Sequence, residues 1–375
     1  MKILVINWRD VKNPLAGGAE IYFQEIFRRI VTRGHEVTQL AVNFPGASKT
    51  DLIDGIRIVR MGGANTFNFS VWAGLNRILR AGGYDIVIDD LNKIPFYSPW
   101  FCDKPVLAMM MHLFRKSIFS EVAFPLAAYV YLTESLIPRC YKNNLFAVLS
   151  PSSKRDLLAF GIREEKMVVI PPGTDTARFV PDLSRKGEPL VLHVGRLKRY
   201  KSTDHLLEAA HALKLKGKRF KVKIVGDGDD LPRLKETSRR LALEDIVEFT
   251  GFISEDDKVR LYQESAVLVE NSLKEGWGLI VMEANACATP VIAARSPGLV
   301  DSVHDGKTGF LYEYGNVPEL TERLGQLLDD AQLRSTMGAA GVEWAKSISW
   351  DSATDKMLVV IERAVTRGQV PGIGE

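Results

Sequence analysis

Short apolar runs alternate with amphipathic stretches over nearly the whole chain, and this alternation constrains the fold more than any other feature. The apolar runs have the length of buried strands and fall at 2–7, 36–43, 56–61, 85–90, 105–111, 145–150, 167–171, 189–195, 221–226, 246–250, 266–270 and 290–294. Helical periodicity fills gaps between them, as at 19–32, 203–215, 231–242 and 278–288. Apolar strands separated by helices predict parallel sheets covered on both faces. The expected fold class is therefore α/β, with two doubly wound domains.

The stretch from Pro171 to Glu188 interrupts this alternation. It contains proline, glycine and charged residues but little apolar periodicity, which is typical of a linker. A chain of 375 residues is long enough for an ordinary core on each side. We expect one domain over 1–173 and another over 174–350, followed by a last helix near 351–366.

Composition excludes several classes of protein. A formal charge of +3 is too small for nucleic acid to be the main partner. The basic residues between Lys198 and Lys223 suit anionic ligands, although a solvated helix face explains most of them. Three cysteines, Cys102, Cys140 and Cys287, form neither an even set nor a metal-ligand spacing, which indicates a reducing compartment.

No segment of the sequence reads as a signal peptide or a membrane span. The N-terminus begins as a buried strand and lacks a longer apolar region with a cleavage site. No stretch reaches the roughly 20 apolar residues of a transmembrane helix, and the longest candidate, Val122–Leu132, contains Pro125. The expected location is cytoplasmic.

Two glutamates, Glu275 and Glu283, mark the most informative stretch for function. The first lies in a glycine-rich loop and the second in the helix that we expect to follow. Eight residues at helical rise place the carboxylates on the order of 12 Å apart, farther than the roughly 5–9.5 Å of a glycosidase pair. This spacing suits the two ends of one long polar ligand, with a diphosphate at the helix N-terminus between them.

A basic loop follows the first strand of the second domain. Its sequence is Gly195-Arg196-Leu197-Lys198-Arg199-Tyr200-Lys201. The guanidinium of Arg196 and the ammonium of Lys201 could neutralise a leaving diphosphate. The alternative interpretation is a solvated basic loop, because four cations lie within six residues.

Glycine-containing turns follow other predicted strands. Gly17 and Gly18 open the first helix, where a backbone can approach an anion closely; the alternative is a simple tight turn. Two further turns could hold the edge of a nucleobase, although such turns are common at strand ends; they are Val225-Gly226-Asp227-Gly228 and Gly251-Phe252-Ile253.

His112 ends the apolar run at 105–111. A histidine at a strand end could form a hydrogen bond with a sugar hydroxyl, and the alternative is a structural role. The stretch 112–136 that follows combines Arg115 and Lys116 with many apolar residues. One interpretation is an interfacial helix that reaches lipid-linked acceptors at the inner face of the cell membrane. The other is a helix packed against the first sheet or a partner chain.

Taken together, these stretches resemble the retaining glycosyltransferases of family 4, also called glycosyl transferases group 1. The most specific part is Lys274–Leu279 with Glu283–Ile292, which is similar to the E-x7-E signature of the family. Gly195-Arg196-Leu197 with Lys201 resembles its diphosphate-binding segment, and Gly17–Glu20 is similar to its N-terminal glycine loop.

This resemblance implies a GT-B fold, in which two Rossmann-like domains face each other across a cleft. The N-terminal domain would bind the acceptor and the C-terminal domain the nucleotide sugar, and the segment 351–375 would return to the first domain. Glu275 would hold hexose hydroxyls and Glu283 the ribose, while His112 would touch the donor sugar. The full set of donor-binding positions would be Gly17, Gly18, Arg196, Lys201, Gly226, Ile253, Glu275, Gly276, Trp277, Gly278, Leu279 and Glu283.

The expected activity is transfer of a hexosyl group, with retention, from a nucleoside-diphosphate sugar to a hydroxyl of a glycan or lipid-linked acceptor. We expect no metal and no cofactor beyond this co-substrate, because the pair Asp227 and Asp229 has no further ligands beside it. Alternatives are a nucleotide-sugar epimerase or phosphorylase-like enzyme of the same architecture, or a non-catalytic nucleotide-sugar-binding subunit. The sequence assigns neither the base nor the hexose nor the acceptor.

Overall fold

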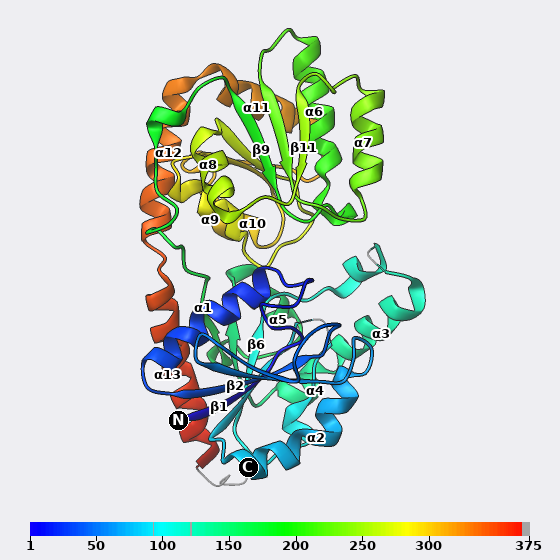
Figure 1. Ribbon diagram of the computed structural model, residues 1–375, viewed down its shortest axis with the longest axis vertical. Coiled ribbons are helices and arrows are strands. Elements are labelled where there is room, and N and C mark those ends of the chain that lie inside the picture. The colour runs from blue at the N-terminus through cyan, green and yellow to red at the C-terminus, as the bar shows by residue number, and fades with distance from the viewer. Residues whose placement is uncertain (93, 121, 370–375) are drawn as a thin grey trace. The chain divides into compact units, whose positions relative to one another are not determined.

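The computed structural model describes residues 1–92, 94–120 and 122–369, which form two compact units (Figure 1). The first unit comprises residues up to Pro172 and the C-terminal segment from Trp350, and the second comprises Gly173–Ser349. The predicted limits at 173 and 351 differ from these by one residue each. Residues 370–375 of the returning segment lie outside the described residues.

An eight-stranded sheet forms the centre of the first unit, in the order β3-β4-β2-β1-β5-β6-β7-β8. All neighbouring strands are parallel except β3 and β4. The chain builds outward from β1 in one direction and then from β5 in the other, as doubly wound folds do. The strands are β1 (Lys2–Ile6), β2 (Glu36–Val42), β3 (Thr50–Ile53), β4 (Ile56–Met61), β5 (Ile86–Asp90), β6 (Val106–Met110), β7 (Leu145–Val148) and β8 (Met167–Val169).

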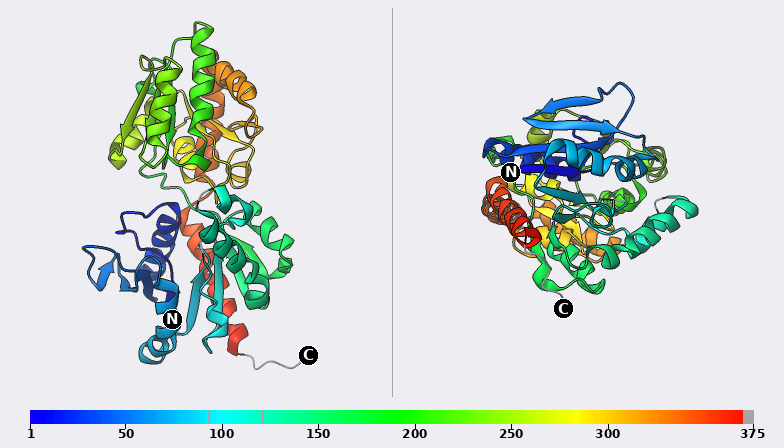
Figure 2. Two further views of the ribbon diagram at one scale, coloured as in Figure 1. Left: turned by 90° about the vertical axis from the view of Figure 1, so that its right-hand side faces the viewer. Right: turned by 90° about the horizontal axis from the view of Figure 1, so that it is seen from below.

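Helices flank this sheet, and the last of them follows the second unit in sequence (Figure 2). Helix α13 packs on α1, where Arg33 Nη1 lies 2.5 Å from Asp355 Oδ1 and the Tyr22 and Trp350 rings are 6.1 Å apart. The helices of this unit are α1 (Gly18–Thr32), α2 (Phe67–Gly82), α3 (Phe124–Ser135), α4 (Ile137–Tyr141), α5 (Pro151–Ala159) and α13 (Trp350–Gln369), with short 3-10 turns η1 (Ser98–Trp100), η2 (Arg115–Ser120) and η3 (Glu164–Lys166).

The second unit contains a six-stranded parallel sheet in the order β11-β10-β9-β12-β13-β14. Its strands are β9 (Leu190–Val194), β10 (Lys221–Val225), β11 (Val247–Gly251), β12 (Val267–Glu270), β13 (Val291–Ala294) and β14 (Gly309–Tyr312). The helices are α6 (Thr203–Leu215), α7 (Leu231–Arg240), α8 (Glu255–Glu264), α9 (Leu279–Ala286), α10 (Leu299–Ser302), α11 (Val317–Asp329) and α12 (Ala331–Lys346), with turns η4 (Leu183–Arg185) and η5 (Arg199–Lys201). The prediction of two doubly wound α/β domains is confirmed.

Burial explains why the sequence pattern predicted these sheets. β5, β6, β9 and β12 are buried along their whole length, because helices cover both faces of a parallel sheet.

None of the helices in the described residues combines the length and hydropathy that crossing a bilayer requires.

Two short strands, β3 and β14, were not predicted. β3 lies at the sheet edge with an alternating, half-exposed pattern, so it lacks the apolar run of a central strand. Its hairpin with β4 turns at Asp54 and Gly55, whose φ angles are 48° and 80°. An Asp-Gly pair between two strands is a known hairpin signal, and it could have predicted β3.

Candidate active site

The loop that carries Glu275 begins at the switch point of the second sheet. β9 and β12 are neighbours there, and the chain builds outward from them in opposite directions. Ligands of such sheets bind beyond the carboxyl ends of the strands at this point. The chain leaves β12 at Glu270, passes through Glu275 and enters α9 at Leu279. The predicted glycine-rich loop followed by a helix that contains Glu283 is confirmed.

Lys201 and Glu275 are in direct contact. Lys201 Nζ lies 2.7 Å from Glu275 Oε1, and the lysine is only 9% exposed. Lys201 ends η5, and the amide of Leu273 donates a 2.8 Å hydrogen bond to the carbonyl of Tyr200. This backbone contact joins the basic loop to the Glu275 loop, so it brings together two residues that lie 74 positions apart in the sequence.

A second carboxylate, which sequence reasoning missed, faces the same lysine. Glu270 is fully buried, and its Oε2 lies 3.7 Å from Lys201 Nζ. Burial by itself lowers the pKa of Lys201, but the carboxylates of Glu270 and Glu275 outweigh it and raise that pKa well above its ordinary value. The signal that could have found Glu270 is an acidic residue that closes an otherwise apolar strand.

The other cations of the basic loop differ from Lys201. Lys198 Nζ lies 2.6 Å from Asp229 Oδ2, and Arg199 Nη1 lies 3.9 Å from Asp230 Oδ1. Arg196 is exposed. The interpretation of a solvated basic loop therefore fits Lys198 and Arg199, whereas it does not fit the buried Lys201.

Glycines allow the loops at this edge of the sheet to approach one another closely. A Cβ atom at Gly226 would lie 1.9 Å from the carbonyl oxygen of Gly195, and one at Gly228 would lie 2.1 Å from that of Leu197. At Gly298, a Cβ atom would lie 2.3 Å from the carbonyl oxygen of Glu275. The loops after β9 and β10 are thus held against each other, and the loop after β13 is held against the Glu275 loop.

The start of α9 leaves donor groups for a ligand. Gly278 has a φ of 103°, which favours glycine, and it precedes the first turn of the helix. Backbone N–H groups in a first helical turn have no partner within the helix. Trp277 is buried, and its Nε1–H has no hydrogen-bond partner among the described residues. A buried donor without a partner marks a position where a ligand or water acceptor is favoured.

Glu283 belongs to a separate cluster on α8 and α9. Lys258 Nζ lies 3.1 Å from its Oε2, and the hydroxyl of Tyr262 donates to the same oxygen over 2.8 Å. Burial raises the pKa of Glu283, while Lys258 and Tyr262 stabilise the charged form. In the described part of the chain, His, Cys, Asp and Glu side chains do not gather in groups of three or more that could hold a metal ion.

The remaining predicted residues lie in the first unit. Gly17 and Gly18 do open α1, but the amide of Gly17 already donates a 2.7 Å hydrogen bond to the Glu20 carboxylate. His112 follows β6, is half-buried and meets the Phe114 ring edge-on at 4.9 Å. The structure therefore brings Lys201 and Glu275 together, while His112 and the glycine loop belong to the other unit.

The chain matches two family models that together extend through most of both units. Residues 16–178 match Glycosyltransferase Family 4, and residues 175–344 match Glycosyl transferases group 1. The chain belongs to the family 4 glycosyltransferases.

Curated relatives of this family 4 glycosyltransferase include D-inositol 3-phosphate glycosyltransferases. The protein of Corynebacterium aurimucosum is 32% identical over 233 residues, which cover 57% of this chain and 55% of the relative. That of Kineococcus radiotolerans is 33% identical over 242 residues, with 57% and 56% coverage. The chain thus spans about half the length of the curated relatives it matches.

Solved structures that resemble this family 4 glycosyltransferase share its GT-B fold. Sucrose-phosphate synthase from Thermosynechococcus elongatus has a TM-score of 0.83 at 21% identity, with 98% of this chain and 99% of that chain covered. Anabaena HepE in complex with UDP and glucose has a TM-score of 0.77 at 19% identity, with 97% and 100% covered.

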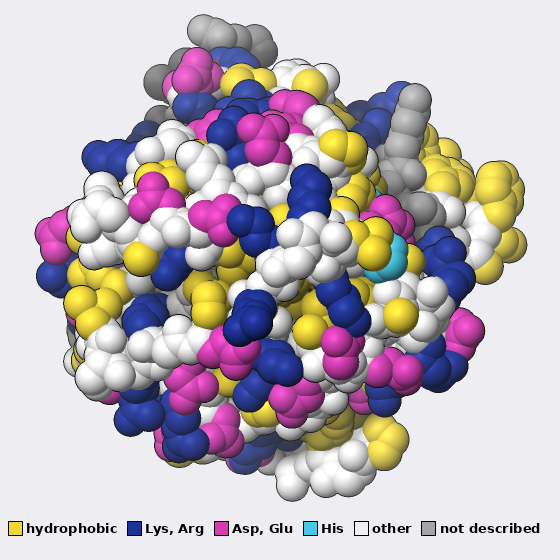
Figure 3. Space-filling view, turned by 90° about the horizontal axis from the view of Figure 1, so that it is seen from above, with side chains coloured by type: hydrophobic (Ala, Val, Ile, Leu, Met, Phe, Trp, Pro, Cys, Tyr) yellow, Lys and Arg dark blue, Asp and Glu magenta, His cyan; other side chains and the backbone are white. Residues whose placement is uncertain are grey.

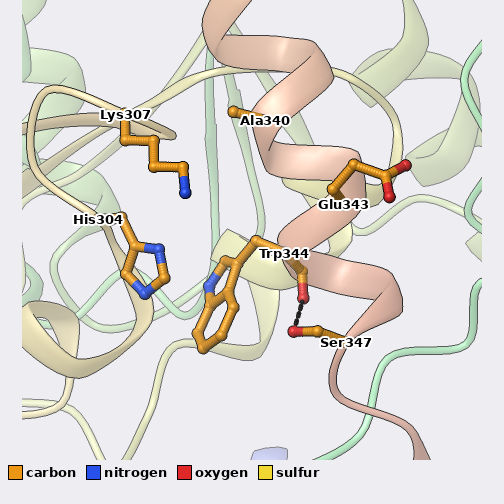
Figure 4. Close-up of a pocket in the computed structure, with 6 residues that line it drawn as sticks. All are labelled: His304, Lys307, Ala340, Glu343, Trp344 and Ser347. Atoms are coloured by element: carbon orange, nitrogen blue, oxygen red, sulfur yellow. Dashed lines mark hydrogen bonds between the residues drawn. The ribbon is translucent and has the colours of Figure 1, made fainter.

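A separate cavity lies between the loop after α10 and the C-terminal part of α12, and none of the predicted site residues line it. It has a volume of about 430 Å³ and is lined by His304, Lys307, Ala340, Glu343, Trp344 and Ser347 (Figure 4). Trp344 Nε1–H donates to the carbonyl of Ser302 over 2.9 Å. A Cβ atom at Gly278 would lie 3.1 Å from Ser302 Oγ. The tryptophan thus supports α10, which in turn packs against the start of α9.

Proposed function

We propose that this family 4 glycosyltransferase moves a hexosyl group, with retention and without a metal ion, from a nucleoside-diphosphate sugar to a hydroxyl of a glycan or lipid-linked acceptor. The observation that carries the proposal is the buried Lys201 ammonium, held at the sheet switch point 2.7 Å from Glu275, which lies in the loop that leads into α9. A fixed cation and a helix N-terminus together favour a diphosphate.

The donor would extend along the carboxyl edge of the second sheet. Lys201, Arg196 and the N–H groups near Gly278 and Leu279 would bind its diphosphate, and Glu275 would bind hexose hydroxyls. Glu283 would reach the ribose, and the turns at Gly226 and Ile253 would reach the base. HepE, a fold neighbour, has been solved with UDP and with UDP-glucose, which supports a donor of this class.

The position of the Lys201 ammonium determines which step of the transfer it would assist. As the bond between the anomeric carbon and the phosphate oxygen breaks, negative charge develops on the leaving diphosphate and faces Lys201. The acceptor oxygen bonds to the same face of the sugar, and a phosphate oxygen takes the acceptor proton. One preorganised contact of this kind contributes roughly 3–4 kcal/mol to transition-state stabilisation. His112 would touch the donor sugar, as the resemblance to family 4 implies.

Product stereochemistry tests this proposal directly. Purified full-length protein is incubated with candidate nucleoside-diphosphate hexoses and glycan or phospho-sugar acceptors, with excess chelator present. The expected product has the anomeric configuration of the donor, measured by proton NMR, and forms at an unchanged rate with chelator. Inversion would refute same-face attack, and activity restored only by a divalent ion would refute metal independence.

A donor-only incubation separates the alternative functions. An epimerase would convert the nucleotide sugar without an acceptor, and a binding subunit would leave it intact even with one. The buried charges of Lys201 and Glu270 favour the transferase, because burying charged groups is costly and such groups concentrate at functional sites.

We further propose that η2 and α3 form an arm that contacts an anionic membrane. The alternative interpretation is a helix packed against the first sheet or a partner chain. One face of α3 is buried, with Ala127, Val130, Thr133 and Glu134. Large apolar side chains of the arm are exposed instead: Phe119, Phe124, Leu126, Tyr129 and Leu132. Hydrophobic side chains gather at the right-hand edge in Figure 3, where this arm lies.

Co-sedimentation with liposomes of anionic lipid tests the arm. The full-length protein is expected to pellet with these liposomes at low salt, and Phe124→Ser with Leu132→Ser should weaken binding at least about 10-fold, because each apolar side chain contributes about 1.5–3 kcal/mol when buried. Leu215→Ser is the matched control, since Leu215 is 75% exposed on α6. Equal binding by control and double variant would contradict the proposal.

A further inference from the structure

We propose that Glu270 is a positioning residue for Lys201: its carboxylate keeps the ammonium in place when Glu275 turns to the donor sugar. This role rests on the proposed function, since it presupposes a diphosphate on Lys201 and a sugar on Glu275. Because Glu270 is fully buried, it would act on the ligand only through the lysine.

The main chain and one side-chain oxygen of Glu270 are fixed. Glu270 is the last residue of β12 and pairs with Ala293 of β13. Its Oε1 accepts hydrogen bonds from the amide of Ser272, at 3.2 Å, and from the Ser272 hydroxyl. The carboxylate therefore has a set position at the end of a central strand.

The second oxygen of Glu270 is available to the lysine. Oε2 is buried, has no hydrogen-bond partner among the described residues, and lies 3.7 Å from Lys201 Nζ. Glu275, by contrast, is partly exposed and lies in a loop, where a side chain can turn toward a ligand. If Glu275 releases Lys201 to bind sugar hydroxyls, a small movement of Nζ brings it within hydrogen-bond distance of Glu270.

The charges around Lys201 make this second carboxylate necessary. Besides the two glutamates, Lys201 lies 5.9 Å from the ring of Tyr200, and burial together with the Lys201 charge lowers the pKa of His193 on β9. His193 makes a 3.0 Å hydrogen bond to the carbonyl of Val269, and burial lowers its pKa, so it stays neutral. Burial disfavours a charged lysine. Without Glu270, the ammonium would depend on Glu275 alone.

Glu270→Gln tests the role, because it removes the charge and keeps the side-chain shape. We expect kcat to fall on the order of 10- to 100-fold through misplacement of Lys201, with the affinity for the acceptor unchanged. The alkaline limb of the kcat profile should move to lower pH, since the lysine loses its proton more readily.

A carboxylate outside the site serves as the matched control. Glu248→Gln removes a carboxylate 3.7 Å from Lys223 on neighbouring strands, at a distance from the site residues in sequence, and should leave both kcat and the profile unchanged.

A measurement without substrate separates this inference from the proposed function. The Cε signal of Lys201, assigned by its loss in Lys201→Arg, is titrated by carbon-13 NMR in wild type and Glu270→Gln. A lower apparent pKa in the variant supports the role of Glu270 even when wild type shows no hexosyl transfer, which would defeat only the proposed function. An unchanged titration together with an unchanged pH profile overturns the inference. If the glutamine variant does not fold, Glu270→Asp, which draws the charge back by one methylene, should shift the titration in the same direction.

Discussion

Lys201→Ala is expected to lower kcat by about 100-fold or more, measured by steady-state transfer assays. The ammonium is a buried positive charge in contact with the Glu275 loop, so under the proposed function its removal would leave the developing charge on the diphosphate without its main partner. Lys198→Ala is the matched control. Lys198 belongs to the same loop but pairs with Asp229, and its loss should change kcat less than threefold. Near-normal turnover in Lys201→Ala would contradict the proposal that Lys201 stabilises the leaving diphosphate.

The same substitution leaves Glu270 and Glu275 close together without a cation. Breaking a buried ion pair by removing one partner costs roughly 3–5 kcal/mol, so Lys201→Ala should also unfold at a lower temperature. Circular dichroism at the assay temperature therefore accompanies the kinetics. A folded variant with lost turnover supports the catalytic assignment, whereas turnover lost only together with structure does not.

Glu275→Ala is expected to lower hexosyl transfer by about 100-fold while the Kd for the nucleoside diphosphate changes only a few-fold. The carboxylate would bind the sugar, and its loss frees Lys201 from one competing partner rather than removing the cation that binds the diphosphate. Isothermal titration with the diphosphate and with the intact nucleotide sugar measures the two effects separately. Glu313→Ala, which removes an exposed carboxylate from its pair with Arg295, is the control. Equal loss of affinity for both ligands would contradict a sugar-binding role.

Local sequence pattern was sufficient for the fold class and for the most informative loop. Buried strands such as β6 and β13 are continuous apolar runs, and the glycines of the Glu275 loop precede a regular helix. These features are encoded within a few residues. β3 was not predicted because an edge strand buries few apolar side chains. The sequence signal for this hairpin lies in the turn at Asp54 and Gly55 rather than in the strand.

The contacts of the site could not be predicted in the same way. The ion pair of Lys201 with Glu275, and the approach of Glu270, depend on β9 and β12 being neighbours in the sheet. Strand order is a property of the whole unit, whereas the pattern of each segment is local. The sequence therefore indicated which residues carry charge near strand ends, but not that one lysine would lie between two glutamates. The roles assigned to Lys201 and Glu275, like those of Arg196, Glu283 and His112, stay predictions.

The glycines at 226, 228 and 298 have a consequence for how such an enzyme can diverge. Their α-hydrogens face carbonyl oxygens so closely that even a methyl group would force neighbouring loops apart. Under the proposed function, changes of donor preference would therefore have to arise in side chains that project from the loops around these glycines, such as the exposed Phe252, because sterics fix the spacing of the loops themselves. Libraries aimed at new nucleotide sugars should randomise those projecting positions and leave the three glycines untouched.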